Sequence, residues 1–171
     1  WAARAALETA ADWSPKYGEP ARTELAALRQ RRGNGPSPGT VQSAIQDLMW
    51  EHAGPFRSGD TLHQALLSLR ACRDQLEELA ISPGDIFNID LQDWYELKAM
   101  LRSAEAVVAA ALNRPESRGA HQRPDFPQTL DPFERNQLLA LSGGALTSRW
   151  TPVVRSSASP EALAGPRHGA T

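Results

Sequence analysis

Three stretches of the chain carry apolar residues at the three- and four-residue spacing that places them on one side of an α-helix. The stretches span about 37–52, 58–80 and 90–113. The residues expected on the buried sides are Val41, Ala44, Ile45, Leu48 and Met49, then Leu62, Ala65, Leu66, Leu69, Leu76 and Leu79, then Leu91, Trp94, Leu97, Leu101, Ala104, Val107, Val108 and Ala111. Short connections require consecutive helices to run antiparallel. The pattern therefore predicts an all-α fold, an antiparallel three-helix bundle of the spectrin-repeat-like kind.

The first residues of each predicted helix suit helix starts. Ser37, followed by a proline, fits an N-cap and the first helical position. Ser58 or Asp60 is expected to begin the second helix, and Asp90 with Asp93 to cap the third.

Upstream of the bundle, residues 1–12 are alanine-rich and favour helix, and 21–32 predict a short helix with a basic end. Cations suit the C-terminal end of a helix dipole. A nucleic-acid patch at 29–32 is the competing interpretation. It is disfavoured because no aromatic residues interleave with the arginines and the net charge is −2.

Downstream, the residues from Asp131 to Glu134 form a capping box that predicts an extra short helix to about Leu141. A pair of glycines follows, and then 150–155 predicts a short strand. Residues 156–171 are poor in apolar side chains and predict an irregular, flexible C-terminal tail.

Length and composition place the chain in the soluble, single-domain class. It has 171 residues, one cysteine and no apolar run of membrane-span length. We therefore expect no direct membrane insertion, no disulfide within the chain and a reducing, cytoplasmic location. Cys72 lies within the second helical pattern, which favours a buried, unreactive thiol.

The chemistry of the chain concentrates in residues 113–127, which we call the arginine-rich loop. Fifteen residues directly after the longest helical pattern contain arginines, a histidine, two carboxylates and three prolines. The candidate site residues are Arg118, His121, Arg123 and Asp125, together with Arg57 between the first two helices. Arginine–carboxylate pairs form strong, directional hydrogen bonds. These can pin the loop or bind a partner, and for Arg57 a solvated side chain is an equal alternative.

Residues 116–127, with the sequence ESRGAHQRPDFP, resemble the ESRGAHxRxDxP signature of the succinate dehydrogenase and fumarate reductase flavoprotein subunits. That signature lies in their C-terminal helical domain, and the resemblance covers about 41–133. L-aspartate oxidase carries a related version, and Ala120 together with Gln122 and Arg123 favours the succinate dehydrogenase and fumarate reductase version over it. The family has an aromatic-and-histidine pair after this loop. Phe133 matches the aromatic, but no histidine follows it.

The resemblance implies an assembly that moves electrons between a dicarboxylate such as succinate or fumarate and an acceptor through FAD. It implies that the helical domain packs on a flavin-binding domain, faces an iron–sulfur subunit and lies at the inner face of the cytoplasmic membrane through partner subunits. It also implies a division of the chain into three parts. Residues 1–36 lead in from the flavin-binding domain, residues 37–142 form the helical bundle, and residues 143–171 form a short strand and a tail.

The chain lacks patterns for redox chemistry of its own. No glycine-rich dinucleotide motif follows a strand, there is no cysteine set for an iron–sulfur cluster, and the histidines are scattered. We expect no catalytic, cofactor-binding or metal-binding residue here, and assign the five candidate residues to an interface between domains or partners. A free-standing, non-catalytic helical interaction module is the remaining alternative.

Overall fold

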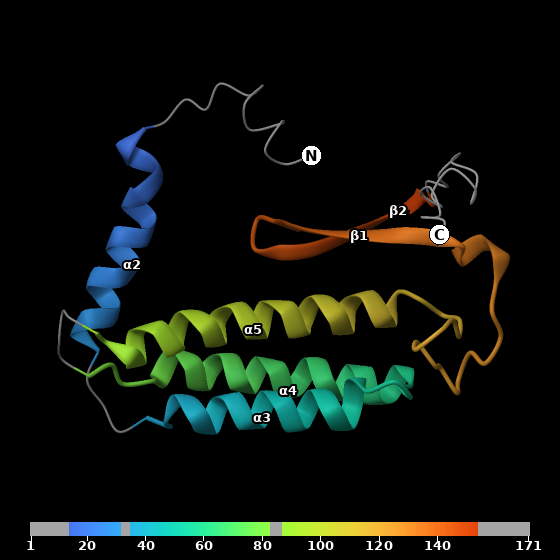
Figure 1. Ribbon diagram of the computed structural model, residues 1–171, viewed down its shortest axis with the longest axis horizontal. Helices are drawn as coiled ribbons and strands as arrows, with labels where there is room; N and C mark the ends of the chain where they lie inside the picture. Colours follow the sequence, from blue (N-terminus) through green and yellow to red (C-terminus); the bar gives the residue numbers. More distant parts are fainter. Residues whose placement is uncertain (1–13, 32–34, 83–86, 154–171) are drawn as a thin grey trace, which may run out of the picture.

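The computed structural model describes residues 14–31, 35–82 and 87–153 (Figure 1). Helices account for most of this part of the chain, followed by one β-hairpin. The elements are η1 (Pro15–Gly18), α2 (Glu19–Gln30), α3 (Pro38–Ala53), α4 (Gly59–Glu78), α5 (Ile89–Leu112), η2 (Asp131–Phe133), β1 (Arg135–Ser142) and β2 (Ala145–Pro152).

Helices α3, α4 and α5 pack side by side in alternating directions, which confirms the predicted three-helix bundle (Figure 1). Their apolar sides form one core, whose larger members are Val41, Ile45, Leu62, Leu69, Leu76, Trp94, Leu97, Leu101 and Val108. Five positions differ from expectation. Ala44, Met49, Leu66 and Leu91 are only partly buried, and Val107 is 47% exposed. Such positions lie at the margin of an apolar stripe, where a helix turns its side chains away from its neighbours.

The N-terminal ends of the three helices are capped, though one cap differs from the prediction. Ser37 accepts a hydrogen bond from the Thr40 amide, and Ser58 forms a capping box with Thr61. Helix α5 is capped by Asn88, whose Oδ1 accepts from the Leu91 amide at 3.0 Å. The prediction that Asp90 caps this helix is wrong, because its carboxylate instead accepts from the Ser82 amide at 2.9 Å.

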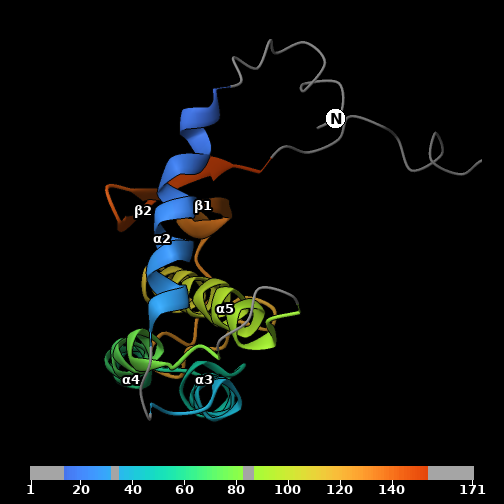
Figure 2. The same cartoon turned by 90° about the vertical axis from the view of Figure 1, so that its left-hand side faces the viewer.

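Helix α2 confirms the short helix expected at 21–32 and rises away from the bundle (Figures 1 and 2). It is anchored from its middle to its C-terminal end. Glu24 pairs with Lys98, Leu28 is buried, and the Arg31 guanidinium lies 2.6 Å from a Glu77 carboxylate oxygen. The helix expected at residues 1–12 lies outside the described residues.

The short helix expected from Asp131 to Leu141 is wrong. Helical geometry lasts only for η2, after which the chain extends into β1. Gly143 and Gly144 have φ values of +56° and +83°, and they form the two-residue turn that returns the chain as β2. The capping box supplies one helical turn, and antiparallel pairing across the glycines then determines the conformation of the residues that follow.

The strand expected at 150–155 overlaps β2, which begins earlier, at Ala145. The boundary expected between the helical bundle and the C-terminal part, after residue 142, falls at the hairpin turn. It therefore separates two strands that pair with each other. The tail expected at 156–171 lies outside the described residues. The fold is therefore the predicted helical bundle with a small hairpin added.

Candidate functional site

The arginine-rich loop folds back across the end of the bundle and meets the connection between α3 and α4. The backbones of the two segments are joined by the Arg57 amide donating to the Gln122 carbonyl and the Gln122 amide donating to the Pro55 carbonyl, both at 3.0 Å. All five candidate residues are therefore brought to one end of the bundle, although Arg57 lies far from the others in the sequence.

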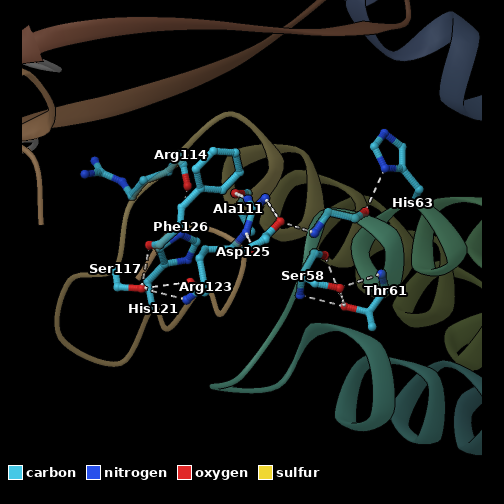
Figure 3. A network of polar contacts seen from close by, with 11 residues as sticks. Ser58, Thr61, His63, Ala111, Arg114, Ser117, His121, Arg123, Asp125 and Phe126 are labelled. Carbon is cyan, nitrogen blue, oxygen red and sulfur yellow. Dashed lines mark hydrogen bonds and ion pairs between the residues drawn. The ribbon is translucent and has the colours of Figure 1, made fainter. Parts of the chain in front are cut away.

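Arg123 and Asp125 connect two helix ends (Figure 3). Arg123 is only 3% exposed, and its Nε and Nη2 donate to the two oxygens of Asp125 at 2.8 and 2.7 Å. Its Nη1 donates to the Ala111 carbonyl of α5 at 2.9 Å, while Asp125 Oδ2 accepts from the Gly59 amide of α4 at 2.8 Å. The cation is thus at a helix C-terminus and the anion at a helix N-terminus, as the helix dipoles favour.

The electrostatics of Asp125 follow from this geometry. The hydrogen bonds from Arg123 hold the pKa of the Asp125 carboxyl well below its usual range, burial opposes them, and the Gly59 amide lowers the pKa further. Asp125 is therefore a carboxylate at any pH near neutrality. It accepts hydrogen bonds from both Arg123 and the first residue of α4.

Glu116 is the buried centre of the other half of the loop. Its carboxylate accepts from Arg118 Nε at 3.0 Å, from Arg118 Nη2 at 3.1 Å, from the Leu130 amide at 2.9 Å and from Arg114. Burial alone raises the pKa of Glu116. The hydrogen bonds from Arg118, Leu130 and Arg114 outweigh that effect and bring the pKa to about 2.

Sequence reasoning missed Glu116 and Arg114 as site residues. The signal that could have identified them is the spacing, because Glu116 stands two residues from an arginine on either side. Arg114 also donates to the Phe133 carbonyl at 2.8 Å and the Arg135 carbonyl at 2.9 Å, and its guanidinium lies 4.7 Å from the Trp150 ring centroid. Arg114 thereby ties the hairpin to the end of α5.

Ser117 and Gly119 shape the loop between these ion pairs. Ser117 Oγ accepts from the Arg123 amide at 2.8 Å and lies 2.9 Å from the Phe126 carbonyl, to which it donates. Gly119 has a φ of +58°, a left-handed conformation that glycine adopts without strain. It allows the tight turn in which the backbones of Arg118 and His121 exchange hydrogen bonds at 2.8 and 3.0 Å.

His121 faces inward from this turn, and its Nε2 lies 3.0 Å from the Arg114 carbonyl (Figure 3). A carbonyl only accepts, so Nε2 carries the proton. Burial lowers the pKa of His121, the hydrogen bond to Arg114 opposes this, and the charges of Arg57 and Arg123 lower the pKa further. The imidazole is therefore neutral near pH 7.

Arg57 differs from the loop arginines. Its Nη1 donates to the Ala53 carbonyl at 3.3 Å, whereas its buried Nε has no hydrogen-bond acceptor in the described part of the chain. Burial and the charge of Arg123 lower its pKa. Among the described residues Arg57 forms no ion pair with the loop's carboxylates, which pair with Arg114, Arg118 and Arg123.

A cleft of about 350 Å³ lies between the loop and the start of the hairpin. Its lining residues are Arg114, Arg118, His121, Phe133, Glu134, Arg135, Asn136 and Val153. Two of its lining arginines, Arg114 and Arg118, already donate to Glu116 and to backbone carbonyls.

Over residues 14–31, 35–82 and 87–153, no three histidine, cysteine or acidic side chains come together as a metal site. In the same ranges no helix is both long and apolar enough for a membrane span. A flavin dinucleotide needs a strand, a glycine-rich turn and a helix N-terminus. The described strands form one antiparallel hairpin, with no helix following either strand in the described residues. This part of the chain does not fit FAD.

Comparison with known proteins identifies a family whose model matches most of this chain. The family described as fumarate reductase flavoprotein C-term matches residues 42–161. The fumarate reductase flavoprotein subunit of Mycobacterium tuberculosis is 36% identical over 116 residues, which are 65% of this chain and 20% of that one. The L-aspartate oxidase of a Synechocystis strain is 32% identical over 102 residues, 52% of this chain and 18% of that one. The chain spans about a fifth of the length of these relatives.

Solved structures agree on the fold. The E. coli quinol fumarate reductase has a chain that superposes with a TM-score of 0.78 at 23% identity, covering 90% of this chain and 28% of that one. A chain of the Mycobacterium smegmatis Sdh1 complex in the apo form superposes with a TM-score of 0.73 at 24% identity, covering 86% of this chain and 26% of that one. At these identities the likeness concerns the fold alone.

Proposed function

This chain belongs to the fumarate reductase flavoprotein C-terminal family, and on that premise we propose that it is the C-terminal helical domain of an FAD-dependent oxidoreductase. The reaction is of the succinate dehydrogenase and fumarate reductase type, with electrons passing between a dicarboxylate and an acceptor. FAD is bound by another part of the protein, because the described residues offer it no cradle.

The observation that supports a structural role for this domain is how the loop uses its charged groups. Arg114, Arg118 and Arg123 pair with the carboxylates of Glu116 and Asp125. His121 is neutral and hydrogen-bonded to a carbonyl. Groups held in this way stabilise a shape rather than transfer protons, so the domain's role is structural: it presents a rigid surface to the flavin-binding part.

We assign Arg118, His121, Arg123 and Asp125 to maintaining that surface and Arg57 to contact across it. The partners are the flavin-binding domain and, in the assembled enzyme, an iron–sulfur subunit. Attachment to the inner face of the cytoplasmic membrane runs through partner subunits. The chain itself needs no nucleic-acid contact for this role, consistent with its net charge of −2.

The proposal is tested with the full-length protein purified from its source. We expect a flavin absorption band, and succinate oxidation with an artificial electron acceptor or fumarate reduction with a reduced dye. R123M should weaken the retention of flavin and the activity, while R70M, at an exposed position on α4, serves as the matched control. A colourless protein without dicarboxylate activity would reject the proposal and favour a helical interaction module.

L-aspartate oxidation is the second candidate function, since the Synechocystis relative is named for it. It is measured on the same sample with L-aspartate as the electron donor and oxygen or fumarate as the acceptor. Activity with L-aspartate but not with succinate would assign the protein to that reaction and leave the structural role of this domain unchanged.

A further inference from the structure

Arg57 has most of its hydrogen-bonding capacity unused. A guanidinium carries five N–H donors. In the described part of the chain one side-chain contact is formed, Nη1 to the Ala53 carbonyl at 3.3 Å, and the buried Nε has no acceptor. A buried donor without an acceptor is uncommon and costs free energy in a folded protein.

The charge of Arg57 is also uncompensated. The loop contains Arg114, Arg118 and Arg123, and these three arginines pair with the carboxylates of Glu116 and Asp125. No ion pair to Arg57 occurs among the described residues. Burial, and after it the charge of Arg123, disfavour the charged form of Arg57 and lower its pKa. A carboxylate from elsewhere would relieve both deficits together.

The position of Arg57 is preorganised for such a contact. Its backbone amide donates to the Gln122 carbonyl, and its guanidinium is held by the C-terminal end of α3. Two large aromatic side chains nearby in the chain face solvent: Trp50 is 82% exposed and Phe56 is 76% exposed. Tryptophan, phenylalanine and arginine are enriched in the buried centres of protein interfaces.

We propose that Arg57 receives the carboxylate of an aspartate or glutamate from the part of the same polypeptide that precedes this domain. Trp50 and Phe56 are covered in the same contact. The inference rests on the proposed function. The matched relatives are about five times the length that this chain covers, so most of the surface available to pack here belongs to the same polypeptide. A second subunit as the source is an outcome that the experiment distinguishes.

The contact is tested by chemical coupling in the full-length protein. R57K places an amine where the guanidinium was, and a carbodiimide joins an amine to an adjacent carboxylate as an amide, with loss of water. We expect a cross-linked peptide that connects the introduced lysine to an acidic residue upstream of this domain. R70K, on the exposed side of α4, is the matched control and should give no such peptide.

Lysine is shorter than arginine, so the lysine of R57K can fall short of the carboxylate that Arg57 contacts. A charge exchange therefore provides a second, independent measurement. R57E should lower the melting temperature of the flavin-bound protein more than R57Q. Replacing the acidic residue identified upstream with arginine should restore the melting temperature of the R57E protein.

The outcomes separate the two proposals. If the protein binds flavin but R57K couples only within this domain or to another subunit, and no upstream replacement restores R57E, the Arg57 contact is overturned and the proposed function stands. If the protein holds no flavin, the proposed function fails and this inference fails with it.

Discussion

Asp125 accepts a hydrogen bond of 2.8 Å from the backbone amide of Gly59, across 66 residues of chain. Gly59 is the first residue of α4, so the carboxylate lies at a helix N-terminus where its charge is favoured. A Cβ at position 59 would stand 3.3 Å from that carboxylate oxygen, which shows how closely the loop approaches the helix. One side chain thus joins the loop, through Arg123, to the bundle.

D125A should destabilise the isolated domain by about 2 kcal/mol, because it leaves the buried Arg123 guanidinium without its carboxylate and removes a contact to α4. Partial exposure of Asp125 allows water to replace some of the loss. The free energy of unfolding is measured by urea denaturation followed by circular dichroism. D74A, at an exposed position on α4, is the control and should change stability by less than about 0.5 kcal/mol. Equal effects from the two substitutions would contradict the role of Asp125.

Glu116 should make the domain sensitive to acid. Its pKa is about 2 in the folded protein against 4.5 for the ordinary side chain, so the unfolded state binds the proton more readily. Glu116 contributes about 3 kcal/mol to the free energy of unfolding. This contribution is complete above about pH 5 and is lost as the pH falls towards 2.

The measurement for Glu116 is the free energy of unfolding between pH 6 and pH 2.5, compared between the wild-type domain and E116Q. The variant should be less stable at pH 6 and show a flatter pH dependence. An unchanged slope would mean that Glu116 is not the group responsible. D74N, at an exposed position on α4, is the control substitution.

His121 should titrate below the ordinary histidine range, since burial and the charges of Arg57 and Arg123 lower its pKa. R57Q removes one of those charges, so the pKa of His121 should rise in that variant. The imidazole proton shifts are followed by NMR as a function of pH, with H121Q used to assign the signal. The folded pKa lies below the unfolded one, so His121 costs stability as the pH falls through about 6.5. A pKa unaffected by R57Q would show that the two side chains are farther apart than the structure places them.

L69A should destabilise the bundle by about 2–5 kcal/mol, because Leu69 is fully buried between the helices and truncation leaves a cavity. L67A is the matched control on the same helix, since Leu67 is 55% exposed and its truncation should cost less than about 0.5 kcal/mol. Both are measured by thermal and urea denaturation. A loss below about 1 kcal/mol for L69A would contradict its place in the core.

Much of the bundle was predictable from the sequence because amphipathic helices carry their burial in their own periodicity. Leu69, Leu97 and Leu101 were expected in the core and are buried there. Ser37 was expected to cap α3 and does so through the Thr40 amide. These interactions are local or follow from one repeating pattern, so they need no knowledge of distant parts of the chain.

The hairpin and the cap of α5 were not predicted because each depends on a choice between local and non-local partners. Asp131 to Glu134 satisfies the rule for a helix start, but β1 gains more by pairing with β2 across the turn at Gly143. Asp90 satisfies the rule for an N-cap, but it binds Ser82 when the chain turns back, and Asn88 takes the cap. Local rules do not rank such alternatives.

By itself the sequence determined the three helices, their antiparallel order and the place where charged residues concentrate, because periodicity and residue type act over short distances. Only the tertiary structure decided how those charges are paired. Glu116 became the buried acceptor for two arginines and Asp125 the link to α4, whereas Arg57 has no carboxylate partner among the described residues. Ion pairing depends on distance and burial in three dimensions, and residues close together in the sequence compete for the same few acids.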